Sequence, residues 1–313
     1  MKLEIRKFEI DDISSLWELM NAFEYVPISI ELHRQKYQFD EQIAQREDEY
    51  LALFAGIFEE RIVGFCRLEK IKTLFIAQVG VIPEARGKGL GTTLLAVVLE
   101  LARAQNVEKL YCQVDNSVVH DKKFLDKHGI KTSKRNILSK LEITNFSPVE
   151  YQLLEQQLLL KGYSFAYLAD FQDTAETREN LYQLVRQSVE DDAGFDGEFE
   201  TLEEFNDRIW QIYWNARDFW CFALYRSSFV ALAGTRLVGV STLWETQLTG
   251  VARNHRGLGL AQVVKMKSIL NSWEYGAETI KTGNDSGNLA MIAINFKMGF
   301  VHTGDRYSLE LSL

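Results

Sequence analysis

A duplicated glycine-rich segment is the feature that most constrains how this chain folds. Residues Val81–Gly91 read VIPEARGKGLG and align without a gap with Val251–Ala261, which read VARNHRGLGLA. The offset of 251 − 81 = 170 residues also carries Gly129 onto Gly299. A single register over this distance indicates an internal duplication, so we expect two related domains.

The residues around the two copies predict the same order of secondary structure. Alternating apolar residues bounded by turn signals predict strands, and apolar residues at helical spacing predict helices. In the first half we expect strands at 2–8, 50–58, 62–70, 74–82 and 109–114, and helices at 11–22, 90–104 and 120–128. In the second half we expect strands at 163–168, 229–233, 237–244, 245–252 and 279–282, and helices at 174–189, 258–273 and 288–298. Each half therefore predicts a mixed α/β fold, in which helices cover both faces of a mixed sheet.

No proline- or glycine-rich linker separates the two halves. Residues 147–161 are apolar and rich in Gln and Glu at helical spacing, and Pro148 stands where the first turn of a helix accepts proline. This pattern predicts a connecting helix. We therefore place the junction near residue 145, with an N-terminal domain at 1–145 and a C-terminal domain at 146–313.

Composition limits the partners of the chain. Of its 313 residues 46% are hydrophobic and 25% are charged, which is typical of a soluble globular protein. Apolar runs such as 94–99 are too short to cross a bilayer and the N-terminus lacks a signal peptide's apolar stretch, so we expect a cytoplasmic protein without membrane contact. The net charge of −9 disfavours nucleic acid, whose phosphates need a basic surface, and favours a cationic substrate.

The cysteines indicate neither a disulfide framework nor a metal site. Cys66, Cys112 and Cys221 are odd in number and widely spaced, and each lies in an apolar, strand-like segment. We interpret them as buried thiols and predict no metal site.

Each glycine-rich segment joins a predicted strand to a predicted helix. The first N–H groups of a helix have no partner within the helix, and together with the helix dipole they form a site for an anion. Glycine at positions 87, 89 and 91 lets an anion approach the backbone, and Ala261 is the smallest replacement for the last of them. Arginine begins both segments and adds positive charge. We therefore predict pyrophosphate sites at Arg86–Gly91, the first glycine turn, and at Arg256–Ala261, the second glycine turn.

Other phosphate-binding motifs do not fit the first glycine turn. A P-loop requires Gly five residues before its Gly-Lys pair and Ser or Thr after it, and these positions hold Ile82 and Gly89. The dinucleotide-binding motif spaces its glycines as Gly-x-Gly-x-x-Gly, whereas Gly87, Gly89 and Gly91 alternate. A turn that serves only tight packing between strand and helix stays open as an alternative, although the duplication disfavours it.

The order strand, Arg-Gly-x-Gly-x-Gly/Ala, helix, strand, helix, Gly-Phe resembles the acyl-CoA-binding core of the GNAT N-acetyltransferase superfamily. Two such cores, with Thr249-Gly-Val, His255-Arg-Gly-Leu-Gly-Leu-Ala and Met291–Phe300 in the second, resemble its tandem branch, which includes mycothiol-synthase-like proteins. The resemblance implies two tandem GNAT-like domains that bind acetyl-CoA, with the strand before each turn contacting the pantetheine arm. The CoA-binding residues that it implies are Val79, Gly80, Val81, Arg86, Gly87, Lys88, Gly89, Leu90, Gly91 and Thr92 in the first half, and Thr249, Gly250, Val251, Arg256, Gly257, Leu258, Gly259, Leu260, Ala261, Asn288 and Asn295 in the second.

Departures from the family pattern separate the two halves. Many members have a tyrosine four residues before the closing glycine, where it protonates the CoA thiolate, and Leu125 and Asn295 hold that position here. A common asparagine eleven residues before the same glycine is kept as Asn288 and is replaced by Val118 in the first half. The second half therefore keeps more of the catalytic pattern. We expect the C-terminal half to be catalytic, with the reverse assignment open and no general acid identified.

Candidates for the base and for the acceptor site also lie in the second half. Superfamily members often use a glutamate near the position of Glu245 to draw a proton from the amine through water, and a surface strand residue is the alternative. His255 is interpreted as a neighbour of the second glycine turn. The acidic residues within 190–207 form either a solvated surface or the rim of a site for a cation. The aromatic residues within 210–220 either line that site or belong to the core.

The expected function is an acetyl-CoA-dependent N-acetyltransferase that acts on a primary amine of a small, cationic molecule. The resemblance implies direct transfer, in which the protein aligns two substrates and manages protons without a nucleophile of its own. A non-catalytic acyl-CoA-binding or sensing module is the alternative, motivated by the missing tyrosines, and a fold without CoA binding is a third. The sequence leaves the acceptor, the acyl chain length and the oligomeric state open.

Overall fold

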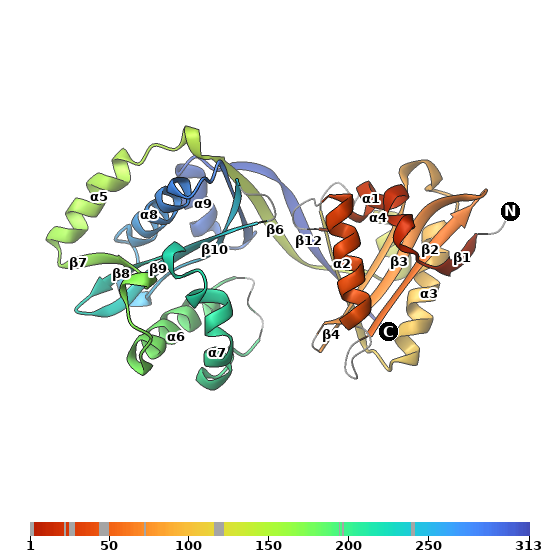
Figure 1. Cartoon of the computed structure of the whole chain (residues 1–313), viewed down its shortest axis with the longest axis horizontal. Helices are drawn as coiled ribbons and strands as arrows, with labels where there is room; N and C mark the ends of the chain where they lie inside the picture. The colour runs from red at the N-terminus through yellow and green to blue at the C-terminus, as the bar shows by residue number, and fades with distance from the viewer. Residues whose placement is uncertain are drawn as a thin grey trace. The chain divides into compact units, whose positions relative to one another are not determined.

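The chain divides into two compact units. The computed structural model describes residues 3–21, 23–24, 29–43, 50–71, 73–115, 122–193, 195, 197–238 and 242–313. The first unit combines residues 1–135 with 305–313, and the second comprises residues 136–304 (Figure 1).

The first unit is a sheet covered by helices on both faces. Its elements are β1 (Glu4–Lys7), α1 (Ile13–Asn21), α2 (Ile30–Ile43), β2 (Tyr50–Phe58), β3 (Arg61–Ile71), β4 (Leu74–Val81), α3 (Leu90–Ala104), β5 (Lys109–Asp115), α4 (Lys122–His128), the start of β6 (Lys131–Glu142) and the end of β12 (Val301–Ser312). The strand order begins β1-β2-β3-β4-β5-β12, and the β4–β5 pair is parallel. One core packs α1 against Ala55 and Phe65, and a second packs α3 against Cys66 and Leu68, so the helices lie on opposite faces.

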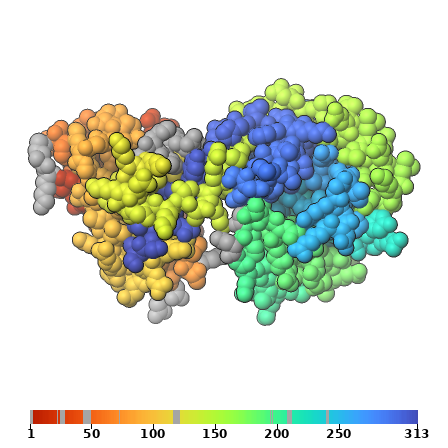
Figure 2. All heavy atoms as spheres, turned by 180° about the vertical axis from the view of Figure 1, so that it is seen from behind, coloured from red at the N-terminus to blue at the C-terminus, as the bar shows by residue number. Residues whose placement is uncertain are grey.

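The second unit repeats this architecture. Its elements are the rest of β6, α5 (Val149–Leu160), β7 (Tyr163–Tyr167), α6 (Ala175–Glu190), α7 (Leu202–Ile209), β8 (Trp220–Tyr225), β9 (Ser228–Leu237), β10 (Leu243–Val251), α8 (Leu260–Glu274), β11 (Thr279–Asp285), α9 (Leu289–Lys297) and the start of β12. The strand order is β6-β11-β10-β9-β8-β7, with β10 and β11 parallel. One core contains α6 and α7, and the other contains α8 with part of α5. Figure 2 shows α8 and α9 on one face of this unit.

Each unit takes one strand from the distant part of the chain. In the first unit, Arg306–Ser312 of β12 pairs antiparallel with β5. In the second unit, residues 136–142 of β6 pair antiparallel with β11. The chain therefore passes from one unit to the other within β6 and within β12, and α5 belongs to the second unit.

The duplication is visible in the local structure. Helices α3 and α8 begin and end 170 residues apart, and so do β5 and β11. A short 3-10 turn precedes each glycine turn, at Pro83–Ala85 and at Arg253–His255. The strand that follows the closing helix, by contrast, pairs in the other unit's sheet.

The expected elements occur with several corrections. The bounds expected for two strands, 237–244 and 245–252, are wrong. Strand β9 extends to Leu237, and a single strand, β10, covers residues 243–251. Elements α2, α7, β6, β8 and β12 were not predicted from the sequence. Strand β8 is apolar on both faces, so it lacks the alternation that identifies a half-buried strand. The predicted strand start at residue 2, helix end at residue 22 and helix start at residue 120 lie outside the described residues.

The aromatic residues within 210–220 belong largely to the core. Tyr213, Trp214 and Trp220 are buried against α6 and α7, and Phe219 packs against Trp244. The core interpretation therefore holds for these four residues.

Candidate functional site

The two glycine turns have the same backbone conformation. Gly87 and Gly89 have φ angles of 77° and 83°, and Gly257 and Gly259 have φ angles of 76° and 88°. Side chains rarely tolerate such angles, so glycine is required for the turn itself. The arginine before each turn also repeats its contact, because Nε of Arg86 donates to the carbonyl of Val81 and Nε of Arg256 to that of Val251, both at 3.0 Å.

Both turns end in the first turn of a long helix. Helix α3 begins at Leu90 and α8 at Leu260, each with glycine in a left-handed conformation as the N-cap. The first N–H groups of such a helix have no partner within the helix, so they can bind an anion together with the helix dipole. The structure thus gives both predicted pyrophosphate sites the same backbone geometry.

The strand before each turn separates from its parallel neighbour. The β4–β5 register ends at the pair Ile76 and Tyr111, and the β10–β11 register ends at Glu245 and Lys281. Beyond these pairs the strands form a fork, in which one edge of β4 and of β10 offers backbone groups to a ligand. Residues 79–81 and 249–251 lie beyond the branch points, where the resemblance expects the pantetheine arm.

Only the second fork begins with a bulge. The register between β10 and β9 shifts between Thr246 and Leu248, whereas β4 pairs with β3 without a shift. A bulge turns the backbone groups and increases the local twist of a strand. The two forks therefore differ at the point where they open.

Glycine also permits close packing on each strand. A Cβ on Gly80 would lie 2.9 Å from Phe65 and 3.0 Å from Leu19 of α1. A Cβ on Gly250 would lie 1.9 Å from Oγ of Ser188 in α6. These two glycines let a helix contact the strand directly, so their main contribution is to the shape of the fork.

A cavity of about 650 Å³ opens beside the second glycine turn. It is bounded by β10, by the turn and the start of α8, by the start of α9 and by the end of α6. The predicted residues in its wall are Thr249, Gly250, Val251, Arg256, Gly257, Leu258, Gly259, Leu260, Ala261 and Asn288, and they are joined by His255 and by Leu154, Ser188, Asp191 and Asp192. The structure therefore gathers most of the second set of predicted residues around one space.

The cavity described in the first unit is smaller and apolar. Its volume is about 140 Å³, and Val79, Leu95, Cys112 and Phe124 are part of its wall. Of the predicted residues only Val79 borders it. Gly91 faces Phe124, because a Cβ there would lie 3.3 Å from that ring.

Other first-half residues have local contacts around the turn. Oγ1 of Thr92 lies 3.1 Å from Nε2 of His128 on α4, and Nζ of Lys88 lies 5.0 Å from the centre of the Phe58 ring. Residues 116–121, between β5 and α4, lie outside the described residues.

The wall of the larger cavity fits an acyl-CoA. The hydroxyl of Thr249 is buried without a hydrogen-bond partner among the described residues, so it can donate to a ligand in the fork. Oδ1 of Asn295 is also buried without a hydrogen-bond partner among the described residues, while Nδ2 of Asn295 donates to Oδ1 of Asn284 at 2.7 Å. The backbone of Gly257 is open to a pyrophosphate, whereas Leu154 of α5 packs against Gly259. The open backbone of Gly257 and the unpaired hydroxyl of Thr249 are features that such a ligand can use.

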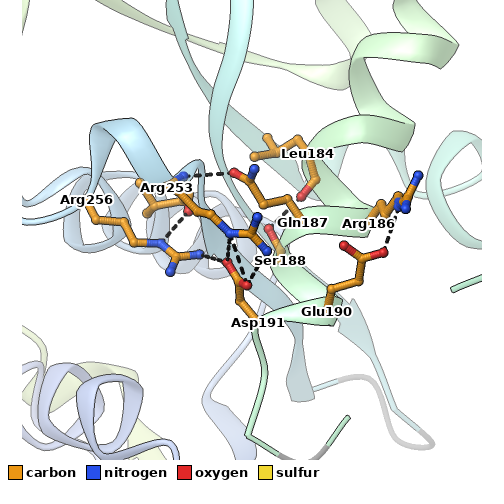
Figure 3. Close-up of polar contacts among 9 residues, drawn as sticks. Leu184, Arg186, Gln187, Ser188, Glu190, Asp191, Arg253 and Arg256 are labelled. Carbon is orange, nitrogen blue, oxygen red and sulfur yellow. Dashed lines mark hydrogen bonds and ion pairs between the residues drawn. The ribbon is translucent and has the colours of Figure 1, made fainter. Parts of the chain in front are cut away.

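Asp191 contacts the arginine of the second glycine turn. It lies just after α6, between Arg253 and Arg256, and accepts hydrogen bonds from both (Figure 3). The bond from Nε of Arg253 is 2.9 Å long, and Oε1 of Gln187 accepts from the Arg253 backbone at 2.8 Å. Hydrogen bonding from Arg253 outweighs desolvation and, with Arg256, lowers the pKa of Asp191 to about 2. Arg86 has no such carboxylate among the described residues.

Asn288 and His255 fix the remaining edges of the cavity. Asn288 caps α9, because its Oδ1 accepts from the Met291 N–H at 3.2 Å, and its Nδ2 donates to Asp192 at 2.9 Å. Nδ1 of His255 lies 2.9 Å from the Tyr163 hydroxyl. His255 therefore is a neighbour of the second glycine turn in space as well as in sequence.

Glu245 lies at the branch point of the second fork but outside the cavity wall. Its side chain is 7% exposed and pairs with Arg236 on β9. Nε of Arg236 donates to its Oε1 at 2.6 Å, and Nε2 of Gln247 donates to the same oxygen at 2.9 Å. Gln247 is the residue at the bulge, so Glu245 and Arg236 hold the bulged segment.

The acidic residues within 190–207 have different surroundings. Asp191 and Asp192 border the cavity, Glu190 pairs with Arg186, and Glu204 accepts from the Thr201 backbone at the start of α7. Asp196 lies outside the described residues. The sequence could not separate these roles, because each depends on a partner in another turn or element.

Several features of the site were not predicted from the sequence context. Leu154, Ser188 and the pairing of Asp191 with Arg256 depend on helices that precede the turn by many residues. Lys265 was not predicted either, although a signal existed, because the 170-residue offset places it over the apolar Leu95.

Neither metal ligands nor membrane spans were found in the described part of the chain. No group of three or more His, Cys, Asp or Glu could hold a metal ion there, and no described helix is long and apolar enough to cross a membrane. Cys66 and Cys221 are buried as expected, whereas Cys112 is only partly buried. Burial raises the pKa of all three thiols to about 12, which disfavours the reactive thiolate.

Comparison with known proteins gives both a family match and matches of fold. The acetyltransferase (GNAT) family model matches residues 13–130. A GCN5-related N-acetyltransferase from Sphaerobacter thermophilus is similar in structure with a TM-score of 0.73 at 13% identity, covering 99% of this chain and 95% of that one. A tandem GNAT protein from the clavulanic acid biosynthesis pathway gives a TM-score of 0.65 at 17% identity, covering 99% and 98%. An acetyltransferase of the GNAT family from Colwellia psychrerythraea gives 0.55 at 13% identity over the whole of both chains. No curated protein sequence matches the chain.

Proposed function

We propose that this chain is an acetyl-CoA-dependent N-acetyltransferase, because the acetyltransferase (GNAT) family model matches residues 13–130 and the whole chain is similar in fold to solved GNAT proteins, one of them a tandem GNAT protein. The proposed acceptor is a primary amine of a small, cationic molecule. The proposed site of transfer is the second unit. The cavity beside the second glycine turn carries this proposal, because it joins an anion site to a fork with an unpaired hydroxyl.

Different residues of the second unit would bind different parts of acetyl-CoA. The N–H groups at the start of α8 and the guanidinium of Arg256 would bind the pyrophosphate. The open edge of β10 and the hydroxyl of Thr249 would bind the pantetheine arm. When bound, acetyl-CoA supplies a thioester whose acetyl group an amine can attack. Backbone N–H groups near the bulge are suited to stabilise the negative charge on the carbonyl oxygen, a contribution of about 3–4 kcal/mol per donor in enzymes generally.

The second unit is preferred although the family model matches the first. The described cavity of the first unit is apolar and borders none of residues 86–91. Leu125 lines it at the position that Asn295 holds in the second unit. We therefore propose that the first unit binds CoA structurally or supports the second unit.

For Glu245 the contacts favour a positioning role over proton abstraction. An amine base needs a carboxylate oxygen within reach of the amine or of one water. The Oε1 of Glu245 already accepts from Arg236 and Gln247. We propose that Glu245 fixes the bulge in β10, and that Asp191 and Asp192 give the cavity its attraction for a cation.

Titration with acetyl-CoA and a broad panel of amines tests the proposal. Arg256→Ala should weaken binding at the second site, and Arg86→Ala is its matched control because both arginines have the same backbone contact. We expect CoA release with at least one amine, and we expect Arg256→Ala to reduce turnover more than Arg86→Ala. Tight binding without turnover by any amine would favour a sensing module. An effect of Arg86→Ala alone would move the reaction to the first unit.

A further inference from the structure

A lysine is buried in the core at the second fork. Lys265 lies on α8 and is 2% exposed, and the 170-residue offset pairs it with Leu95, which is also buried. Its Nζ lies 3.4 Å from Oγ1 of Thr246 and 5.0 Å from the centre of the Phe300 ring. Among the residues that the structure describes, no carboxylate pairs with it. A leucine at the equivalent position of the first unit indicates that the fold itself does not need a charge here.

Lys265 lies one helical turn beyond the cavity wall, on the side of the fork. Ala261 and Gln262 line the cavity, and Lys265 follows them on the same face of α8, four and three residues later. The β10–β11 register ends at Glu245, and Thr246 is the first residue of β10 beyond that pair. The contact with Thr246 therefore places the amine of Lys265 where the two strands separate.

The carboxylates described on the surrounding elements form ion pairs with basic residues other than Lys265. On the strands, Glu245 pairs with Arg236, while Lys281 belongs to the last pair of the β10–β11 register. On α5, Glu155 pairs with Lys267. Burial alone lowers the pKa of Lys265 to about 7. Both protonation states of its amine are therefore accessible at neutral pH.

Amide formation from a thioester requires two proton movements. The sulfur leaves with the electron pair of the carbon–sulfur bond and needs a proton, and the nitrogen of the new amide must lose one. The amide of Asn295 cannot supply a proton by ionisation at neutral pH. Glu245 at the branch of the fork is paired with Arg236, whereas the amine of Lys265 beside Thr246 is paired with no carboxylate among the described residues and can exchange a proton there.

We propose that Lys265 donates the proton that the departing sulfur takes up. The proposal rests on the function proposed above. The ammonium of Lys265 transfers one proton to the sulfur as the carbon–sulfur bond breaks, which leaves a neutral amine. That amine then takes up, directly or through water, the proton lost by the nitrogen that has bonded to the acetyl group. Lys265 ends in its starting state, and atoms and charge balance.

The variant Lys265→Met tests this role, and Lys267→Met is the matched control. Methionine is apolar and of similar length, and the leucine in the first unit indicates that the site accepts an apolar side chain. Lys267 lies two residues further on α8 and pairs with Glu155. We expect Lys265→Met to lower kcat about 100-fold at neutral pH with little change in KM, and to remove the limb near pH 7 from the kcat profile. Lys267→Met should do neither.

A second readout does not depend on turnover. The ultraviolet absorbance of the thiolate reports the ionisation of CoA bound to the protein. A nearby amine that shares a proton with the sulfur makes the thiolate appear at lower pH. We expect Lys265→Met to raise the apparent pKa of the bound thiol enough to cut the thiolate fraction about tenfold.

Any one of the following results would overturn the proposal. The first is a thiol titration that is the same in the parent and in Lys265→Met. The second is acetylation of Lys265 itself on incubation with acetyl-CoA, detected by mass spectrometry, because a lysine that attacks the thioester is not its acid. The third is a parent protein that binds no CoA, which would remove the proposed function as well. If the parent binds CoA and turns over while Lys265→Met behaves like the parent, only the role of Lys265 falls.

Discussion

Replacing Asp191 with asparagine should strengthen acetyl-CoA binding at the second glycine turn. The carboxylate of Asp191 holds the guanidinium groups of Arg253 and Arg256, and Arg256 belongs to the predicted pyrophosphate site. A phosphate must therefore compete with this carboxylate for Arg256 and also approach its negative charge. Asparagine keeps the size of the side chain and removes the charge.

The magnitude follows from the pKa of Asp191. A value of about 2 in place of 3.8 corresponds to roughly 2.4 kcal/mol of interaction with its surroundings. The side chains of Arg253 and Arg256 are 56% and 45% exposed, so solvent screening reduces this to about 1 kcal/mol. We expect the Kd for acetyl-CoA to fall about fivefold, and the gain to shrink as salt is added.

Isothermal titration calorimetry at low and moderate ionic strength measures this change. Asp173→Asn is the matched control, because Asp173 pairs with Arg178 at the other end of α6 and leaves the cavity untouched. A Kd that is unchanged or higher in Asp191→Asn would refute the reasoning. It would mean that Asp191 orients Arg256 for the ligand in place of competing with it.

Two further predictions concern folding. Because unfolding returns Lys265 from a pKa of about 7 to an ordinary value near 10.4, the unfolded chain binds a proton that the folded protein lacks between these values. Lys265 therefore makes the free energy of unfolding rise with pH across that window. Denaturant unfolding from pH 7 to 10 should show a steeper rise for the parent than for Lys265→Met. Equal slopes for the two proteins would contradict the prediction. A fragment of residues 1–145 loses the strand of β12 that pairs with β5, so it should unfold at lower temperature or aggregate, whereas residues 1–135 joined to 305–313 by a short linker should fold. Circular dichroism and gel filtration decide this, and a stable 1–145 monomer would show that the exchanged strand is dispensable.

Features that depend on neighbouring residues were predicted well from the sequence. The bounds of β2 and α3 were correct, and the start and end of most other elements were within a few residues. The fold class was also correct, because it follows from the repeated order of strands and helices. The strands β6, β8 and β12 were missed, since a strand buried on both faces or paired with a distant partner has no distinct local pattern.

The sequence by itself determined the duplication, the two glycine turns and the helices that begin at them. A turn with positive φ at two glycines and a helix N-terminus is built from consecutive residues, so a short segment of sequence is enough to specify it. Tertiary structure decided which strand completes each sheet. It also decided the contacts of Asp191 with Arg256 and of Glu245 with Arg236, and the position of Lys265 at the fork. Each of these pairs residues from different elements, and only the packing of helices on the sheet brings them within reach of one another.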